Sequence, residues 1–405
     1  MVFNSIFFIF CFLPVFMLIY YLAPGKLRNL LLFLGSLIFY AWGEPVYVIL
    51  MLFSSIFNYY MGTELERLYY DDRKQKINLI FSIIINLAVL VFFKYYGFLL
   101  NTIGGIIGIH IPHPELSLPI GLSFYTFRNL SYLFDIYLSK VSAQRNFLTF
   151  SVYSTMFPYT SAGPIVRYTD IETQLKQRTI NISKFGIGAE LFVKGLAKKV
   201  LLADNLSVLY SSICGHPQMS VFTSWLGILA YTMQLYFDFS GYSDMAIGLG
   251  KMLGFDFNKN FDYPYISTSV SEFWRRWHIS LSTWFRDYIY IPLGGSRCKK
   301  TKVIRNTFII FIISGLWHGA NWTFILWGIY HALLFMPLLL LNKNRRYTKN
   351  VIAVGKLSPS FKEAVQMFST FFLVLIGWII FRSNDIGEAS DYLARLFSPS
   401  LFEVS

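Results

Sequence analysis

The chain has 405 residues, of which 55% are hydrophobic and only 14% are charged, and its formal net charge is +13. Soluble domains contain about 45–50% apolar and about 25% charged residues, so these numbers exclude an ordinary soluble fold as well as a disordered chain. Three cysteines, Cys11, Cys214 and Cys298, are too few and odd in number for a disulfide scaffold. The composition therefore predicts an all-α polytopic membrane protein.

Apolar runs recur along the whole chain. A spanning helix needs about 20 mostly apolar residues, and the run 3–22 fits as a retained helix, since no Lys, Arg or cleavage site marks it as a signal peptide. Further runs lie near residues 29–42, 45–62, 77–100, 118–138, 147–164, 186–203, 219–240, 303–317, 320–341 and 364–381. Breaks at Pro45, Gly121 and Pro158 indicate bent or re-entrant pieces. We expect about nine to eleven spanning helices in a single membrane domain over residues 1–405.

Positive charge is concentrated in three short segments between apolar runs, at residues 63–76, 296–305 and 342–349. Cytoplasmic loops carry an excess of Lys and Arg, so we assign all three segments to the cytoplasm. The basic residues are scattered rather than gathered on one face, which argues against nucleic acid as a partner. No internal repeat is visible, which weakens the hypothesis of an inverted-repeat transporter.

Residues 272–287 form the densest polar cluster in this apolar sequence, and ionisable groups at membrane depth are costly and usually functional. If the segment is one helix, helical spacing gives it an aromatic face that contains Trp274, Trp277, Leu281 and Trp284. A different face would carry Arg275, His278 and Ser282. Glu272 lies four residues before Arg276, which is the spacing of a helical ion pair. An amphipathic interfacial helix with an aromatic anchor face explains this pattern equally well.

A second cluster surrounds His318, a lone histidine inside an apolar stretch from Val303 to Leu341. Burial disfavours the charged form of histidine, and a neutral imidazole can accept a proton from a hydroxyl or a thiol. The alternative is a hydrogen-bonded core histidine between packed helices. Gly315 and Gly319 would let other groups approach the ring closely, and Asn321 lies next to it in sequence, so we favour a functional role.

A third feature, at residues 234–244, places two acids, hydroxyl groups and a glycine within an apolar run. The segment could line a cavity or supply a partner for buried arginines. The alternative is a helix break capped by one of Ser240, Ser243 and Asp244. His331 lies near the expected end of a helix and is interpreted as structural or interfacial. His110 and His113 could suggest a metal, but no third ligand accompanies them locally.

The sequence lacks the motifs of several common classes of enzyme. The sequence lacks a phosphate-binding G-x-x-x-x-G-K-[ST] loop, an H-E-x-x-H zinc motif and a complete G-x-S-x-G nucleophile motif. The chemistry that remains is acid–base catalysis by histidine within the membrane. A thioester donor suits it, because acyl transfer from a thioester to a hydroxyl needs no nucleotide.

These clusters, in this order, resemble the membrane-bound O-acyltransferase family. The resemblance is closest to the bacterial alginate O-acetyltransferase branch, which includes membrane subunits that acetylate peptidoglycan and cellulose. The matching segments are residues 118–127, 157–158, 162–167, 234–248, 272–295 and 315–331. The most specific are the Arg-Trp-His segment that runs on to Tyr288 and the Trp317-His318-Gly319 segment. The resemblance extends over essentially the whole chain.

The resemblance implies a curved ring of helices around a central tunnel, where donor and acceptor reach two histidines from opposite sides of the membrane. His318 matches the family's buried histidine and would be the general base or proton shuttle, with His278 assisting or orienting. The donor would be an acyl-CoA or acyl-carrier thioester, here acetyl-CoA bound as a substrate near the basic loop after Gly295, with no cofactor and no metal. Residues expected to bind substrate or line the tunnel are Arg275, Arg286, Asp287, Trp317, Asn321 and Asp238.

The acetyl group would pass to a hydroxyl on an extracytoplasmic polysaccharide or partner protein. The resemblance thus predicts a multi-pass enzyme of the inner (plasma) membrane, with membrane lipids and no nucleic acid among its partners. Two departures stand out. Tyr159-Thr160-Ser161 fill a family motif that usually has Gln or Lys after its first Pro, which predicts a change on the acceptor side. Many members of the branch continue for another pair of helices, so we expect a short or truncated C-terminus.

Two alternatives stay open. The related branch that transfers D-alanine to teichoic acid has a similar length, but the Pro-Leu-Gly-Gly ending of residues 289–295 favours acetylation. A non-catalytic flippase for a lipid-linked sugar could bind a phosphate carrier through Arg275, Arg276 and Arg286. Such a flippase would not need the His318 segment.

Overall fold

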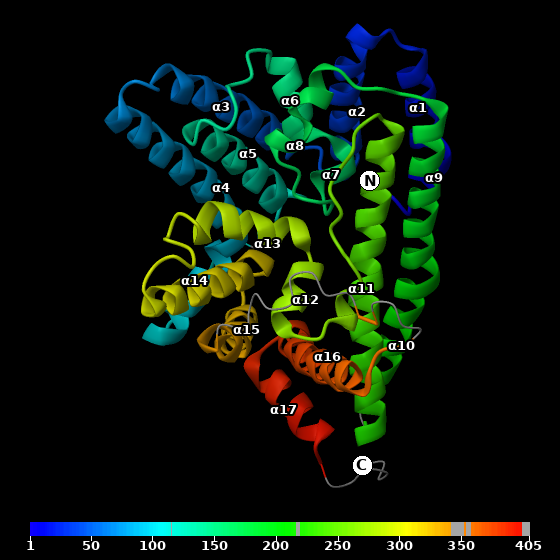
Figure 1. Cartoon of the computed structure of the whole chain (residues 1–405), viewed down its shortest axis with the longest axis vertical. Helices are drawn as coiled ribbons and strands as arrows, with labels where there is room; N and C mark the ends of the chain where they lie inside the picture. The colour runs from blue at the N-terminus through cyan, green and yellow to red at the C-terminus, as the bar shows by residue number, and fades with distance from the viewer. Residues whose placement is uncertain (115, 216–218, 342–351, 354–357, 399–405) are drawn as a thin grey trace. The chain divides into compact units, whose positions relative to one another are not determined.

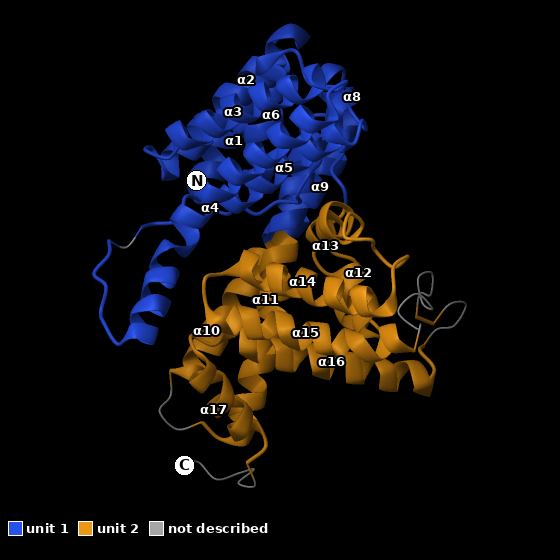
Figure 2. Ribbon diagram, turned by 90° about the vertical axis from the view of Figure 1, so that its left-hand side faces the viewer, with its two compact units in different colours: residues 1–196, 242–258 blue, residues 197–241, 259–405 orange. Residues whose placement is uncertain are grey.

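The computed structural model describes all residues except 115, 216–218, 342–351, 354–357 and 399–405. The described residues form helices, turns and irregular segments without a β-strand (Figure 1). They divide into two compact units: unit 1 comprises residues 1–196 and 242–258, and unit 2 comprises residues 197–241 and 259–405 (Figure 2). One of the three basic segments, residues 342–349, lies outside the described residues.

Among the described residues, four helices are long and apolar enough to cross a membrane: α3 (Val48–Arg67), α4 (Asp72–Ile107), α15 (Trp322–Leu340) and α16 (Phe361–Arg382). The protein is a polytopic helical membrane protein, as its composition predicts. The first predicted run appears as a shorter apolar helix, Phe8–Leu22. The expected total of about nine to eleven spans stays a prediction.

Unit 1 contains the N-terminal helices and the last turns of a long helix from farther along the chain. In addition to α3 and α4, its helices are α1 (Leu13–Leu22), α2 (Arg28–Gly43), α5 (Leu122–Tyr137), α6 (Phe147–Thr155), α7 (Phe157–Thr160), α8 (Tyr168–Lys176) and almost all of α9 (Ile182–Ala197). Its core is aromatic: the Phe157 ring lies 5.4 Å from the rings of both Phe16 and Phe39. The three predicted breaks are confirmed, since Pro45 and Gly121 lie outside helices and Pro158 lies in the first turn of α7.

Gly121 shows why one of these breaks requires glycine. Its φ of +74° lies in the left-handed region that glycine adopts without strain. A Cβ at this position would lie only 2.1 Å from the carbonyl oxygen of Thr160. A side chain would therefore push the start of α5 away from the end of α7.

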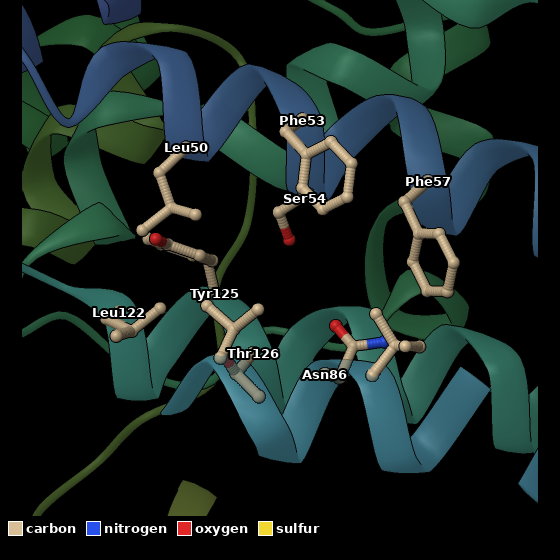
Figure 3. Close-up of a pocket in the computed structure, with 10 residues that line it drawn as sticks. Leu50, Phe53, Ser54, Phe57, Asn86, Leu122, Tyr125 and Thr126 are labelled. Atoms are coloured by element: carbon tan, nitrogen blue, oxygen red, sulfur yellow. The ribbon is translucent and has the colours of Figure 1, made fainter. Parts of the chain in front are cut away.

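A network of amide and hydroxyl side chains crosses the interior of unit 1 between α3, α4, α5 and α6. Asn58 and Asn86 exchange two amide hydrogen bonds of 3.0 and 2.9 Å. Asn129 donates to the Ser54 hydroxyl at 3.0 Å and accepts from Ser154 at 3.1 Å. A cavity of about 10 Å³ lies beside this network, and Figure 3 shows the Ser54 hydroxyl and the Asn86 amide among its apolar lining. That volume holds one water at most.

Unit 2 carries the segments that the sequence singles out for chemistry. In addition to α15 and α16, its helices are α10 (Asp204–Cys214), the first five turns of α11 (Val221–Met252), α12 (Val270–Arg276), α13 (Ile279–Phe285), α14 (Lys300–His318) and α17 (Ile386–Leu396). The predicted helix break at residues 234–244 is wrong, because α11 continues through the whole segment. Helical hydrogen bonding outweighs the local polar side chains there.

Helices α14 and α15 form a tightly packed hairpin (Figure 1). A Cβ at Gly315 would lie 2.1 Å from the carbonyl oxygen of Phe324, and one at Gly328 would lie 2.3 Å from that of Phe311. Glycine at both positions lets the two backbones approach closely, as small residues do in membrane helix pairs. The contact fixes the C-terminal turn of α14, where His318 is the last helical residue.

Candidate functional site

His278 occupies a sharp break in the polar cluster of residues 272–287. The predicted single helix is wrong: α12 ends at Arg276, α13 begins at Ile279, and His278 between them has a φ of 43°. This left-handed conformation is strained for a residue other than glycine, and such strain is concentrated at functional sites. The break is held by the main-chain oxygen of Asn260, which accepts a 2.9 Å hydrogen bond from the Ile279 N–H.

The His278 side chain is buried, with 1% of its surface exposed. Its Nδ1 lies 3.2 Å from Oδ1 of Asn260, whereas its Nε2 has no hydrogen-bond partner among the described residues. Burial, with a smaller contribution from nearby His318, holds the pKa of His278 well below its ordinary value. The ring is therefore neutral at pH 7.

His318 lies beside His278 in the same unit, and Trp317 contacts both rings. The Trp317 ring centroid is 5.7 Å from that of His278 and 5.0 Å from that of His318. His318 also packs edge-on against Trp327 at 5.2 Å and against Phe381 at 5.1 Å. The half-buried ring is thus held by aromatic groups from α14, α15 and α16. The structure brings together the two histidines that the sequence analysis selected.

The carboxylate and guanidinium of the cluster support the break. The predicted pair of Glu272 and Arg276 is confirmed at 2.9 Å. Arg276 also donates to the main-chain oxygen of Asp262 at 3.0 Å, which ties α12 to the segment before it. Thr268 donates to Glu272 through its N–H and its hydroxyl. These charges are therefore neutralised in a structural contact.

The tryptophans of the predicted aromatic face do not act as a common interfacial anchor. Trp277 and Trp284 are each only 3% exposed. Trp277 packs on Trp378 at 4.9 Å, and Trp274 packs on Trp327 at 5.6 Å. The indoles fill the interior of unit 2 because the break at His278 turns α12 and α13 in different directions.

The remaining predicted site residues form separate contacts. Arg286 and Asp287 pair with each other through two hydrogen bonds of 2.6 and 3.0 Å. Asp238 pairs with Lys199 at 2.7 Å, not with an arginine. In the part of the chain that the structure describes, neither Arg286 nor Asp238 forms a hydrogen bond or an ion pair with His278 or His318. Asn321 caps α15 by accepting from the Thr323 N–H, and its amide donates to the Asn384 carbonyl. Arg275 is half-buried at the end of α12.

Two further histidine positions differ in environment. His331 lies in the middle of α15 and is fully buried, with ring contacts to Trp274 at 5.0 Å and Trp327 at 4.9 Å. The expectation that it lies near a helix end is therefore wrong. His113 lies in a loop of unit 1, where its Nδ1 is 3.0 Å from the Ile111 carbonyl. No three His, Cys, Asp or Glu side chains gather as a metal site among the described residues.

Asn260 was not predicted from the sequence, although it contacts His278 through its side chain and Ile279 through its main chain. It lies 18 residues before His278 in an irregular segment. No helical periodicity connects the two positions. A polar residue in an apolar chain is the one signal that could have selected it.

Comparison with known proteins supplies a family for these segments. The profile of the membrane-bound O-acyltransferase family matches residues 46–351, a range that includes Asn260, His278 and His318. A probable alginate O-acetylase of Pseudomonas aeruginosa is 41% identical over 409 residues, which cover 100% of this chain and 76% of the relative. A peptidoglycan O-acetyltransferase of Helicobacter pylori is 34% identical over 96% of this chain and 78% of its own length. A teichoic acid D-alanyltransferase of Bacillus subtilis is 30% identical over 68% of this chain and 71% of its own length.

Proposed function

The chain belongs to the membrane-bound O-acyltransferase family and is an acyltransferase, and on that basis we propose that it transfers acetyl groups from acetyl-CoA to hydroxyls of an extracytoplasmic polysaccharide or partner protein. The observation that carries the proposal is the cluster of His278, Trp317 and His318. It joins two histidines, one neutral and buried, within the matched segments. An acyltransferase needs a proton acceptor at this kind of position.

The names of the relatives support acetyl over other acyl groups. The alginate and peptidoglycan relatives, both described as acting by O-acetylation, cover at least 96% of this chain, whereas the D-alanyltransferase covers 68%. A polysaccharide hydroxyl is accordingly the proposed acceptor. D-alanyl transfer is the second candidate, because that relative also matches at 30% identity. Membership of an acyltransferase family leaves the non-catalytic flippase without support.

The proposed reaction needs one proton acceptor and one proton donor. The acceptor oxygen attacks the thioester carbonyl carbon, a C–O bond forms and the C–S bond breaks. His318 takes the hydroxyl proton as general base and returns it to the departing CoA sulfur as general acid. His318 suits this role because Trp317, Trp327 and Phe381 fix its ring. The donor is a substrate, and no cofactor takes part.

The proposed orientation places donor binding on the cytoplasmic side of an inner membrane. The basic residues between Gly295 and Arg305 precede or begin α14, the helix that ends at His318. Positive charge marks cytoplasmic segments and would attract the phosphates of CoA. The thioester end of CoA would then reach along α14 to the histidines. The further substrate-binding roles of Arg275, Arg286, Asp287, Asn321 and Asp238 stay predictions.

The test uses the purified full chain in lipid vesicles with acetyl-labelled CoA and alginate or peptidoglycan fragments as acceptors. We expect label to reach an acceptor with the wild-type chain and not with His318→Ala. Unchanged transfer by His318→Ala would contradict the role of His318. If acetyl-CoA stays intact with every acceptor while D-alanine is transferred from its carrier, the proposed reaction becomes D-alanylation instead of acetylation.

A further inference from the structure

Asn260 forms hydrogen bonds to the first turn of α13 through both its main chain and its side chain. It is 1% exposed. Its main-chain oxygen accepts from the Ile279 N–H at 2.9 Å. Its side-chain Oδ1 accepts from the Ser280 N–H at 3.2 Å and from the Ser280 hydroxyl at 2.9 Å. The side chain that faces His278 is thus fixed by two hydrogen bonds that do not involve the imidazole, and the main chain by a third.

These bonds determine which amide atom faces the histidine. A main-chain N–H can only donate, so the amide atom that Ser280 N–H contacts is the oxygen, not the nitrogen. The same oxygen lies 3.2 Å from Nδ1 of His278. Because an amide oxygen cannot donate, Nδ1 must carry the hydrogen. A neutral ring then has its lone pair on Nε2.

Aromatic side chains surround the His278 ring and hold its orientation, and with it the direction of the Nε2 lone pair. The ring neighbours of His278 are Phe239, which is perpendicular at 4.7 Å, Phe261 at 6.4 Å and Trp317 at 5.7 Å. Nε2 is buried and has no partner among the described residues. An unpartnered buried nitrogen costs free energy unless a ligand satisfies it. The nitrogen therefore presents an acceptor site for a substrate hydrogen-bond donor.

We propose that Asn260 is a positioning residue that holds His278 in the Nδ1–H tautomer, so that Nε2 accepts a hydrogen bond from a hydroxyl of the acyl acceptor next to the hydroxyl that is acylated. This inference rests on the proposed acetyl transfer. This hydrogen bond orients the acceptor, and the proton of the hydroxyl that is acylated goes to His318 as the C–O bond forms. With the opposite tautomer, Nε2–H would be a donor and could not accept the hydroxyl hydrogen.

Variants of Asn260 separate this role from a purely structural one. Asn260→Ala removes the acceptor of Nδ1–H, so we expect kcat/KM for the acyl acceptor to fall at least about tenfold, with little change in KM for acetyl-CoA. Asn260→Asp restores an oxygen acceptor and should recover most of the loss. Ser280→Ala is the matched control, since it removes one hydrogen bond from the same oxygen but leaves the contact with Nδ1.

The pH profile gives a second readout. The described neighbours of the ring are Phe239 from α11, Asn260 and Phe261 from the segment before α12, and Trp317 and His318 from α14, of which His318 is titratable. A carboxylate at position 260 stabilises the imidazolium form of His278. The acid limb of kcat/KM for Asn260→Asp should therefore move to higher pH, whereas that of Ser280→Ala should not move.

The direct measurement is the ¹⁵N NMR spectrum of the full chain labelled at histidine, in lipid, with His278→Gln to assign the signal. We expect the Nδ1–H tautomer in the wild-type chain and in Ser280→Ala, and loss of this preference in Asn260→Ala. An Nε2–H tautomer in the wild-type chain would overturn the inference. So would equal losses in Asn260→Ala and Asn260→Asp that follow thermal stability alone. A rise in KM for acetyl-CoA in place of the acceptor effect would overturn the assignment to the acceptor hydroxyl. Failure of the proposed function is distinguishable, because it appears as full transfer by His318→Ala.

Discussion

The two units each contain a cluster of buried polar side chains, and the clusters satisfy their hydrogen bonds to different degrees. In unit 1, each of six residues makes a side-chain hydrogen bond to another member: Ser54, Ser55, Asn58, Asn86, Asn129 and Ser154. In unit 2, Nε2 of His278, both ring nitrogens of His331 and the indole nitrogens of Trp274 and Trp327 lack partners among the described residues.

The difference concerns these two clusters and not the whole units, because the Tyr40 and Tyr125 hydroxyls of unit 1 also lack partners among the described residues. A buried polar atom without a partner costs about 1–3 kcal/mol, so a cluster of such atoms persists where a ligand, a water or a reaction uses it. In the unit 1 network, by contrast, the side chains hydrogen-bond to one another and hold the helices together. We therefore expect substitutions in the unit 1 network to change stability, and substitutions at the histidines of unit 2 to change chemistry.

The largest effect is expected for His318→Ala. Loss of a general base typically lowers the rate about 10²–10⁴-fold, and the ring is half-buried at a helix end, so the fold should persist. Acetyl transfer in vesicles and thermal unfolding in detergent measure the two properties. His113→Ala is the matched control, since that histidine lies in a loop of unit 1. Equal losses in both variants would end the distinction between the units.

The next effect concerns the close packing that positions His318. Gly315→Ala would place a Cβ 2.1 Å from a backbone oxygen of α15, and overpacking costs about 1–3 kcal/mol. We expect a lower melting temperature together with reduced transfer, because His318 lies three residues farther along α14. Gly186→Ala in α9 is the control, since its Cβ would meet nothing within 4 Å. If Gly315→Ala changed neither the melting temperature nor transfer, the packing between α14 and α15 would be looser than described.

Acid should weaken the fold through His278. Its pKa is lowered by burial in the folded state, whereas the unfolded chain binds a proton below about pH 6.5. The unfolded state then holds more protons, so stability falls by about 1.4 kcal/mol for each pH unit below that value, until the folded-state pKa is reached. In His278→Gln the stability should depend less steeply on pH. The measurement is the change in melting temperature between pH 7 and pH 5. Asn86→Leu should keep the wild-type dependence on pH, because the unit 1 network holds no titratable group.

The smallest effect is expected in the unit 1 network. Asn86→Leu removes both hydrogen bonds between the two amides and leaves the Asn58 amide oxygen without its donor, although Asn58 Nδ2 still donates to the Ser54 carbonyl. Such interhelical contacts in membranes are worth about 0.6–2 kcal/mol. We expect a modest loss of stability with normal transfer per folded molecule. The double variant Asn58→Leu/Asn86→Leu should be more stable than the sum of the two single variants, since neither amide is left unpaired. Simple additivity would show that the two amides do not depend on each other.

The sequence predicted the parts of the fold that depend on composition and local pattern. The apolar runs, the breaks at Pro45, Gly121 and Pro158, and the Glu272–Arg276 pair follow from hydropathy, backbone restriction and helical spacing. The pairing of His278 with His318 followed from a family resemblance, since they lie 40 residues apart in sequence and no periodicity connects them.

The errors come from tertiary contacts. Local pattern favoured one helix over residues 272–287, but the Asn260 main chain accepts from Ile279 and stabilises a left-handed His278. A capped break near Ser240 was one of two alternatives for residues 234–244, and there the local helical hydrogen bonding keeps α11 continuous. Asp238 was considered as a partner for buried arginines, yet it pairs with Lys199. At His278 and at Asp238 the deciding group lies far along the chain.

Acetyl transfer and melting temperature should be measured on the same preparations of His318→Ala and Asn86→Leu, because these two variants separate chemistry from stability. We expect opposite outcomes: His318→Ala loses transfer at a nearly unchanged melting temperature, and Asn86→Leu melts earlier but transfers normally per folded molecule. Transfer at the wild-type rate by folded His318→Ala would contradict the assignment of His318 as the general base.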